Sequence, residues 1–153
     1  RFLDVAYLVS SWSKDSSTQV GAVIAGPQNE LISVGCNGFP KGMSDDQSLY
    51  VNREEKYSRI VHGEMNALLH CKALPEGCTL YTYPVMPCDR CVVVMLQVGI
   101  RRFVTYTATP DKEERWGEAF KRTRKYIQEL DGVLIENEQK SGEIYKGSKK
   151  DQS

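Results

Sequence analysis

His62-Gly63-Glu64 and Pro87-Cys88-Asp89-Arg90-Cys91 are the two stretches of sequence that decide the fold and the chemistry of this chain. Together they supply one imidazole, two thiols and one further carboxyl group. An imidazole and two thiolates suit Zn²⁺ and leave its fourth tetrahedral position open for water, which is typical of a catalytic zinc site. The predicted zinc ligands are His62, Cys88 and Cys91, and the predicted free carboxyl group is that of Glu64.

Helix and strand patterns alternate on either side of these motifs. The apolar spacing predicts helices over residues 2–12, 62–73, 88–98 and 113–130. The β-rich runs predict strands over residues 20–25, 31–36, 78–83, 102–106 and 133–136. The first two strands form an antiparallel hairpin, and the strands that alternate with helices are parallel. We therefore expect an α/β fold of three layers, α/β/α, around a five-stranded mixed sheet.

The remaining segments are polar. Residues 43–58 predict a long loop, or a loop with a short helix, and loops of this length are usually functional or mobile. Residues 137–153 are rich in Lys, Gln, Ser and Glu, which favours a flexible tail. We expect one zinc-dependent domain over residues 1–136.

The predicted ligands lie at the N-termini of two helices that leave the sheet. Two positive helix-dipole ends then converge on one point, which favours the thiolate forms of both cysteines. Two thiolates and a neutral imidazole on Zn²⁺ give a formally neutral site. In the most activated zinc sites, the pKa of the bound water falls from about 15.7 towards about 7.

Glu64 is two residues from His62 on the same helical turn, so it can face the bound water without ligating the metal. We predict that it carries the water proton to N3 of a pyrimidine and later to the amine that leaves C4. An H-x-E motif with P-C-x-x-C is the pattern of zinc nucleobase deaminases. A different interpretation is that Glu64 only stabilises the helix, because a carboxylate in the first turn interacts favourably with the helix dipole by about 0.3–1 kcal/mol. Glu64 can have both roles.

Composition excludes several partner classes. Lys plus Arg and Asp plus Glu both number 20, so no basic field is present to hold a nucleic acid polymer. No run of about 18 apolar residues occurs, and residues 1–13 lack the apolar middle of a signal peptide. Five cysteines in such a chain favour metal binding and buried thiols over a disulfide framework. We expect no membrane partner and a cytoplasmic location, in the host cytoplasm if the source is viral.

Further blocks of sequence resemble a known family. They are Ser16–Ile24, Gly35–Gly42, Lys56-Tyr57, His62–Ala67 and Gly99-Ile100, together with Pro87–Cys91. Over roughly residues 1–107 the chain resembles the deoxycytidylate (dCMP) deaminases of the cytidine deaminase superfamily. The resemblance implies a cytidine deaminase-like fold, Zn²⁺, and conversion of dCMP to dUMP and ammonia. It also implies a homo-oligomer, often a hexamer, activated by dCTP with Mg²⁺ and inhibited by dTTP.

The resemblance also implies substrate contacts. Asn37 matches the family asparagine that contacts the sugar, the Gly63 N–H takes the place that hydrogen-bonds the pyrimidine O2, and Val20 packs beside the base. Gly63 stands where the family usually has Ala. Glycine retains the N–H donor and makes the turn more flexible. Cys36 departs from a common aromatic residue, and Gln19 departs from a common basic residue.

The Gly35–Gly42 segment is a candidate effector or phosphate site. Its glycines allow backbone N–H groups to approach phosphate oxygens, and Lys41 adds a cation. The candidate residues are Gly35, Gly38, Lys41 and Gly42. A plain turn at a strand end is the other interpretation.

Four rival functions stay open. A tRNA adenosine deaminase, or another cytosine deaminase of the superfamily that acts on free nucleotides, shares the metal motif. A riboflavin-pathway deaminase is a weaker alternative, since no reductase domain follows. A structural zinc module for protein interaction is the non-enzyme alternative, although a free Glu64 beside three ligands argues against it. Zero net charge and the long segment before His62 favour a free nucleotide.

Overall fold

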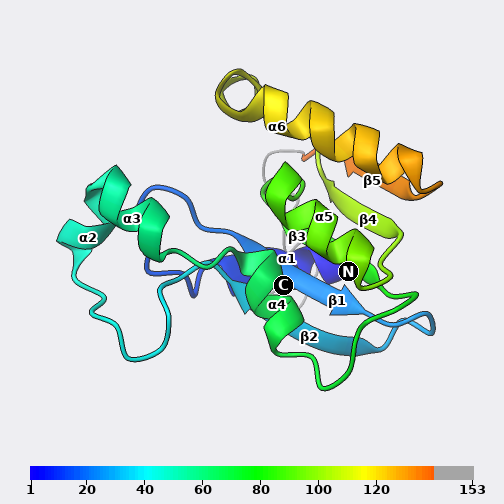
Figure 1. The fold of residues 1–153 in the computed structure, drawn as a ribbon, viewed down its shortest axis with the longest axis horizontal. Helices are drawn as coiled ribbons and strands as arrows, with labels where there is room; N and C mark the ends of the chain where they lie inside the picture. The colour runs from blue at the N-terminus through cyan, green and yellow to red at the C-terminus, as the bar shows by residue number, and fades with distance from the viewer. Residues whose placement is uncertain (140–153) are drawn as a thin grey trace, which may run out of the picture.

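Five strands form one mixed sheet in the order β2-β1-β3-β4-β5 (Figure 1). The strands are β1 (Gly21–Ala25), β2 (Leu31–Cys36), β3 (Thr79–Tyr83), β4 (Arg102–Tyr106) and β5 (Val133–Asn137). Strand β1 is antiparallel to both β2 and β3, whereas β3, β4 and β5 run parallel. This computed structural model describes residues 1–139, so most of the predicted tail, residues 140–153, lies outside the described residues. The predicted five-stranded mixed sheet is confirmed.

Helices cover both faces of this sheet (Figure 1). They are α1 (Phe2–Ser10), α2 (Gln47–Val51), α3 (Arg53–Arg59), α4 (Gly63–Leu69), α5 (Asp89–Gln97) and α6 (Pro110–Glu129). Helix α1 packs against β1 and β3 behind the sheet, while α4 packs on the near face against β1 and β2. Helix α5 lies beside α4 on the near face, and α6 packs against α5 and β5. The predicted three-layer arrangement is confirmed.

Two glycines let the first and fourth helices approach the sheet closely. A Cβ at Gly21 would lie 1.9 Å from the Ala6 carbonyl oxygen of α1. A Cβ at Gly35 would lie 2.3 Å from the Ala67 backbone nitrogen of α4. Gly21 pairs with Cys36, the neighbour of Gly35 on β2, so the two glycines face opposite sides of the sheet. Glycine at these positions sets the depth of both outer layers.

The main core lies between the sheet and the helices of the near face. Leu80 and Phe103 from adjacent parallel strands pack with Val92 and Met95 of α5, and none of the four is more than 1% exposed. A second cluster joins the chain before α5 to Phe120 of α6. The two clusters fix α5 and α6 relative to each other, and this packing places the start of α5.

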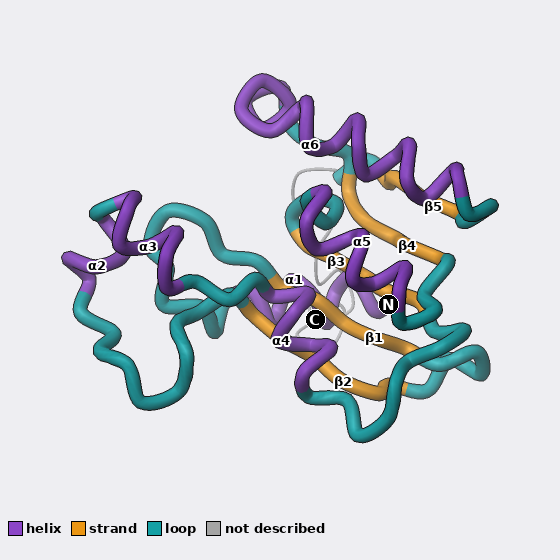
Figure 2. The backbone as a smooth tube through the Cα atoms, viewed as in Figure 1, coloured by secondary structure: helices purple, strands orange, loops and turns teal. Residues whose placement is uncertain are grey.

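The polar segment before α4 contains two short helices. Asp46 caps α2 by accepting a hydrogen bond from the Ser48 backbone N–H, and Asn52 caps α3 in the same way from Glu55. Both helices extend to one side of the sheet (Figure 2). The sequence predicted a loop with at most one short helix here, because the run has no apolar stripe that would reveal helical spacing.

Several predicted helix bounds differ from the observed ones. Helix α6 begins at Pro110 rather than residue 113, because Pro is favoured in the first turn, where its missing N–H needs no partner. Helix α4 ends at Leu69 rather than residue 73. Ala73, the last apolar residue of the predicted helix, is exposed, whereas Cys71 is partly buried against the core after the helix has ended. No helix within residues 1–139 has the length and apolar character that a bilayer crossing requires.

Candidate active site

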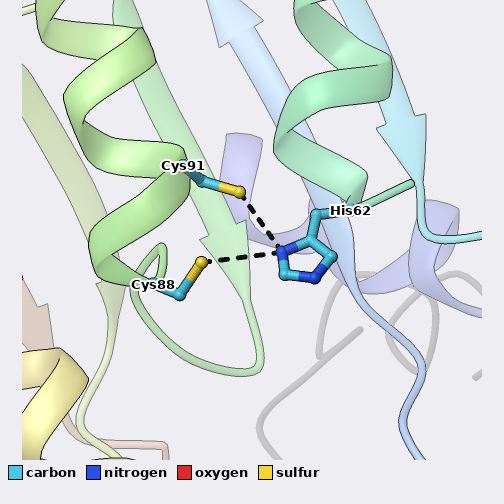
Figure 3. Close-up of side chains that lie close together, drawn as sticks. All are labelled: His62, Cys88 and Cys91. Atoms are coloured by element: carbon cyan, nitrogen blue, oxygen red, sulfur yellow. Dashed lines mark hydrogen bonds between the residues drawn. The ribbon is translucent and has the colours of Figure 1, made fainter. Parts of the chain in front are cut away.

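The three predicted metal ligands meet at the starts of two neighbouring helices. His62 is the N-cap residue of α4, Cys88 is the N-cap residue of α5, and Cys91 follows in the first turn of α5. The His62 Nδ1 atom lies 3.6 Å from the Cys88 sulfur and 3.2 Å from the Cys91 sulfur (Figure 3). His62 is exposed, Cys88 is half-buried and Cys91 is buried. Within residues 1–139 this is the only group of three such side chains that could hold a metal ion.

The spacing of these atoms fits one tetrahedral zinc ion. Zn–S bonds of about 2.3 Å and Zn–N bonds of about 2.0–2.1 Å at tetrahedral angles place sulfur and nitrogen about 3.5 Å apart. The two observed distances, 3.6 Å and 3.2 Å, lie close to that value. All the ligand atoms lie within 4.8 Å of one another. The donor set and its geometry therefore suit Zn²⁺ with three protein ligands.

The two thiols have opposite pKa shifts. A hydrogen bond from the Cys91 thiol lowers the pKa of Cys88 to about 4, against the effect of burial, with His62 contributing a second hydrogen bond. The same contact raises the pKa of Cys91, whose proton is shared with the Cys88 sulfur. The hydrogen bond to Cys88 also raises the pKa of His62. Metal binding requires deprotonated ligands, so binding at this site releases protons from His62 and Cys91.

Glu64 lies in the first turn of α4 with its side chain buried and lining a cavity. It is 5% exposed. Burial raises the pKa of its carboxyl group, and the nearby His62 opposes this rise. Glu64 is therefore a buried carboxyl group with a raised pKa that lines the same cavity as His62 and Cys88.

The cavity beside Glu64 has a volume of about 180 Å³. His62, Glu64 and Cys88 line one part of it. Residues of α6 line another part, namely Arg115, Trp116, Ala119 and Phe120. Mostly apolar walls with a few polar groups are typical of small-molecule sites. The contribution of α6 is the part of the site that sequence patterns missed.

The three predicted substrate contacts all line this cavity. Asn37 orders the loop before β1, because its Oδ1 accepts the Val20 N–H at 2.8 Å and its Nδ2 donates to the Thr18 carbonyl at 2.9 Å. A Cβ at Gly63 would lie 3.2 Å from Val20 Cγ1 and 3.3 Å from the Gly35 carbonyl oxygen. Space here is tight, so an alanine at this position would require Val20 or the Gly35 backbone to shift by a few tenths of an ångström.

A buried ion pair supports the same wall. The Lys56 ammonium of α3 lies 2.6 Å from the Asp15 carboxylate, and their side chains are 10% and 0% exposed. Asp15 also accepts hydrogen bonds from the Ser17 and Thr18 backbone N–H groups. Burial would raise the pKa of Asp15, but these hydrogen bonds and Lys56 outweigh it and lower that pKa. The Lys56-Tyr57 block is part of the resemblance to the family, but the ion pair between Lys56 and Asp15 forms only in the folded chain.

The predicted effector residues do not line this cavity. Gly35 is buried where β2 meets α4, and Gly38 pairs with Val61 in an isolated β-bridge. Lys41 and Gly42 are exposed, with Gly42 at a φ of 93°, a conformation that favours glycine. For Gly35 the observed role is close packing rather than access to a ligand.

A three-ligand His/Cys/Cys site beside a non-ligating glutamate is the arrangement of zinc-dependent nucleobase deaminases. The sequence profile described as "Cytidine and deoxycytidylate deaminase zinc-binding region" matches residues 1–107. The chain belongs to the cytidine and deoxycytidylate deaminase family.

Named relatives agree with this assignment. The chain is 45% identical over 118 residues to an uncharacterized deaminase in the luxG 3′ region of Aliivibrio fischeri, across 77% of this chain and 78% of that protein. It is 34% identical over 109 residues to the deoxycytidylate deaminase of Homo sapiens, across 67% of this chain and 61% of that enzyme. The chain therefore spans about three fifths of the human enzyme.

A solved structure has the same fold. It is the dCMP deaminase from the cyanophage S-TIM5 in complex with dCMP and dUMP, which superposes with a TM-score of 0.65. The match covers 89% of this chain and 93% of that chain at 21% sequence identity. At this identity the likeness shows the cytidine deaminase-like fold.

Proposed function

We propose that this protein catalyses the zinc-dependent hydrolytic deamination of dCMP to dUMP and ammonia. The observation that carries the proposal is the buried Glu64 carboxyl group beside a cluster of three zinc-suited side chains, two of which, His62 and Cys88, line the same cavity as Glu64. Family membership and the relatives described as deoxycytidylate deaminases support the substrate. Zn²⁺, when bound, supplies the Lewis acidity that makes water a nucleophile near neutral pH.

Glu64 carries the protons in this mechanism. Its carboxylate takes a proton from the attacking water and delivers it to N3 of the cytosine, which makes C4 more electrophilic. The water oxygen bonds to C4, and the C4–amine bond then breaks. Glu64 delivers the second water proton to the departing nitrogen, so ammonia leaves and a uracil ring remains. Burial raises the pKa of Glu64, which favours the protonated form that donates to N3 and to the departing nitrogen.

The base is held by the start of α4 and the loop before β1. The Gly63 N–H is the first of α4 and has no partner within the helix, so it can donate to the pyrimidine O2. Val20 lies against Gly63 and would pack on the base. Asn37, fixed by its hydrogen bonds to the same loop, would face the sugar.

The phosphate would lie towards α3 and α6. A second cavity of about 210 Å³ shares Lys56, Tyr57 and Arg115 with the first, and Arg53 also lines it. Asp15 neutralises Lys56. The Arg115 guanidinium stacks 4.8 Å from the centre of the Trp116 ring and donates to the Tyr57 hydroxyl at 3.2 Å. Arg115 is therefore placed to meet an anion at the junction of the two cavities.

Regulation, assembly and location form part of the proposal. dCTP with Mg²⁺ would activate the enzyme, dTTP would inhibit it, and the chain would act as a homo-oligomer, a hexamer, in the cytoplasm. The resemblance supports these features. Exposed apolar side chains such as Leu69 and Leu74, at 68% and 74%, offer surface for subunit contacts. Lys41 and Gly42 are accessible for an effector phosphate.

The test is a substrate panel on one sample of known zinc content. Turnover of dCMP, CMP, deoxycytidine, dCTP and an adenosine-bearing tRNA hairpin is measured, with and without dCTP–Mg²⁺ and dTTP. We expect dCMP to be preferred, and preference for the hairpin or for deoxycytidine would overturn the proposal. Unchanged dCMP rates with both effectors would overturn the regulatory part alone.

A variant pair tests the phosphate site. Arg115→Gln should raise the KM for dCMP at least about 10-fold, because a charge-assisted hydrogen bond contributes about 1.5–3 kcal/mol, and should leave deoxycytidine turnover unchanged. Lys121→Gln, on an exposed part of the same helix, is the matched control. Equal KM values for the two variants would contradict the role of Arg115.

A further inference from the structure

Helix α6 contacts the cysteine motif through one buried hydroxyl group. Thr123 lies in the second half of α6 and is 0% exposed. Its Oγ1 donates a hydrogen bond of 2.8 Å to the carbonyl oxygen of Pro87, a buried residue. A threonine inside a helix commonly bonds to the carbonyl of its own preceding turn. Here the hydroxyl reaches across to another segment, which ties α6 to the chain just before Cys88.

The contact lies one peptide unit before the first thiol. Pro87 is bonded directly to Cys88, and the Pro87 carbonyl belongs to the peptide unit that Cys88 continues. Cys88 has extended backbone angles, φ −68° and ψ 167°, and α5 begins at the next residue. Holding the Pro87 carbonyl therefore holds the plane from which the Cys88 side chain leaves. That side chain must bring its sulfur to about 3.6 Å from His62 Nδ1.

A second contact joins α6 to the first residue of α5. Arg122, next to Thr123, lies 3.3 Å from the carboxylate of Asp89, the first residue of α5. This pair is partly exposed, so its own contribution is small. Its position shows that α6 contacts the Pro87–Cys91 segment on both sides of Cys88. Helix α6 lies beyond residue 107, where the match to the family profile ends.

We propose that Thr123 is a positioning residue that holds the Cys88–Cys91 turn in its metal-binding geometry. The inference rests on the proposed zinc site. Groups that orient metal ligands typically contribute about 10- to 100-fold to metal affinity. Thr123→Val keeps the side-chain shape and removes the hydroxyl group, and should weaken Zn²⁺ binding by about that factor. Thr123→Ser keeps the hydroxyl group and should bind Zn²⁺ much more tightly than Thr123→Val.

Thr105 supplies a matched control. It is also 0% exposed, and its hydroxyl donates to the Thr82 carbonyl at 3.1 Å, away from the cavity-lining residues. Thr105→Val removes a buried hydrogen bond of the same kind. It should lower the thermal midpoint as Thr123→Val does, and should leave the affinity for Zn²⁺ unchanged. The comparison separates metal positioning from general stability.

The readouts are Zn²⁺ affinity by chelator competition and the absorption spectrum of the Co²⁺-substituted protein. We expect altered Co²⁺ bands in Thr123→Val and wild-type bands in Thr105→Val and Thr123→Ser. Equal Zn²⁺ affinity and identical spectra in the two valine variants would overturn the positioning role. If Thr123→Val does not fold, Thr123→Ala and Thr123→Ser, which differ by one oxygen, decide in the same way. A wild-type protein that binds no zinc would instead overturn the proposed function.

Discussion

Lys56→Met should strongly destabilise the protein, because it leaves the Asp15 carboxylate buried without its ion partner. The two side chains are 10% and 0% exposed and lie 2.6 Å apart. Removing one member of a buried pair costs about 3–5 kcal/mol. Asp15 keeps hydrogen bonds from Ser17 and Thr18, so we expect the lower end, about 3 kcal/mol. With a urea m-value of about 2 kcal/mol/M, the unfolding midpoint should fall by about 1.5 M.

A neighbouring pair is the control for this measurement. Lys14 and Asp45 also lie 2.6 Å apart, but their side chains are 62% and 39% exposed. Solvent screens such a pair, so Lys14→Met should change the urea midpoint little. Equal midpoint shifts in Lys14→Met and Lys56→Met at neutral pH would refute the reasoning from burial.

The stabilising contribution of the Lys56–Asp15 ion pair should depend on pH. The folded-state pKa of Asp15 is lowered, so its stabilising contribution is complete above the unfolded value of about 3.9. It is lost as the pH falls through the lower folded value. Without Lys56, the Asp15 pKa rises, and protonation relieves the unpaired charge. The stability difference between wild type and Lys56→Met should therefore narrow as the pH falls from the higher folded-state pKa of Asp15 in the variant to its lowered folded-state pKa in the wild type.

Two further perturbations test the packing and the metal site. Gly35→Ala should lower the free energy of unfolding by about 1–3 kcal/mol, because its Cβ would lie 2.3 Å from the Ala67 backbone nitrogen. Gly38 has open space around it, so the urea midpoint of Gly38→Ala should be close to that of the wild type. Zn²⁺ affinity measured by chelator competition should rise from pH 5 to pH 8, because the raised pKa values of His62 and Cys91 mean that protons must leave before the metal binds; a flat profile would contradict this.

Periodicity predicted the sheet and most of the helices because the elements that build the core have strong apolar patterns. Within the predicted run 20–25, Gly21–Ala25 becomes a fully buried interior strand, and the stretch before Gly99 becomes α5. The helices α2 and α3 were not separated, since they pack through few apolar residues and are set by the caps Asp46 and Asn52. These two helices depend on their N-cap residues, which cannot be distinguished by sequence pattern within a polar segment.

The metal cluster could be predicted because its chemistry is carried by residue type and by short spacing along two helix starts. The wall formed by Arg115 and Trp116 could not, since those residues are far from the motifs in sequence and reach the cavity only after α6 packs on α5. The same holds for Thr123, whose partner Pro87 is 36 residues away.

The central claim is that Glu64 carries protons in the proposed deamination of dCMP and does not itself bind the metal, which His62, Cys88 and Cys91 would hold. The direct measurement compares dCMP turnover and bound zinc in wild-type protein and Glu64→Gln, a substitution of almost equal shape. We predict equal zinc content and a fall in kcat of at least about 10²–10⁴, the usual contribution of a general acid–base group. Substantial dCMP turnover by zinc-loaded Glu64→Gln, or loss of zinc with the substitution, would contradict the account.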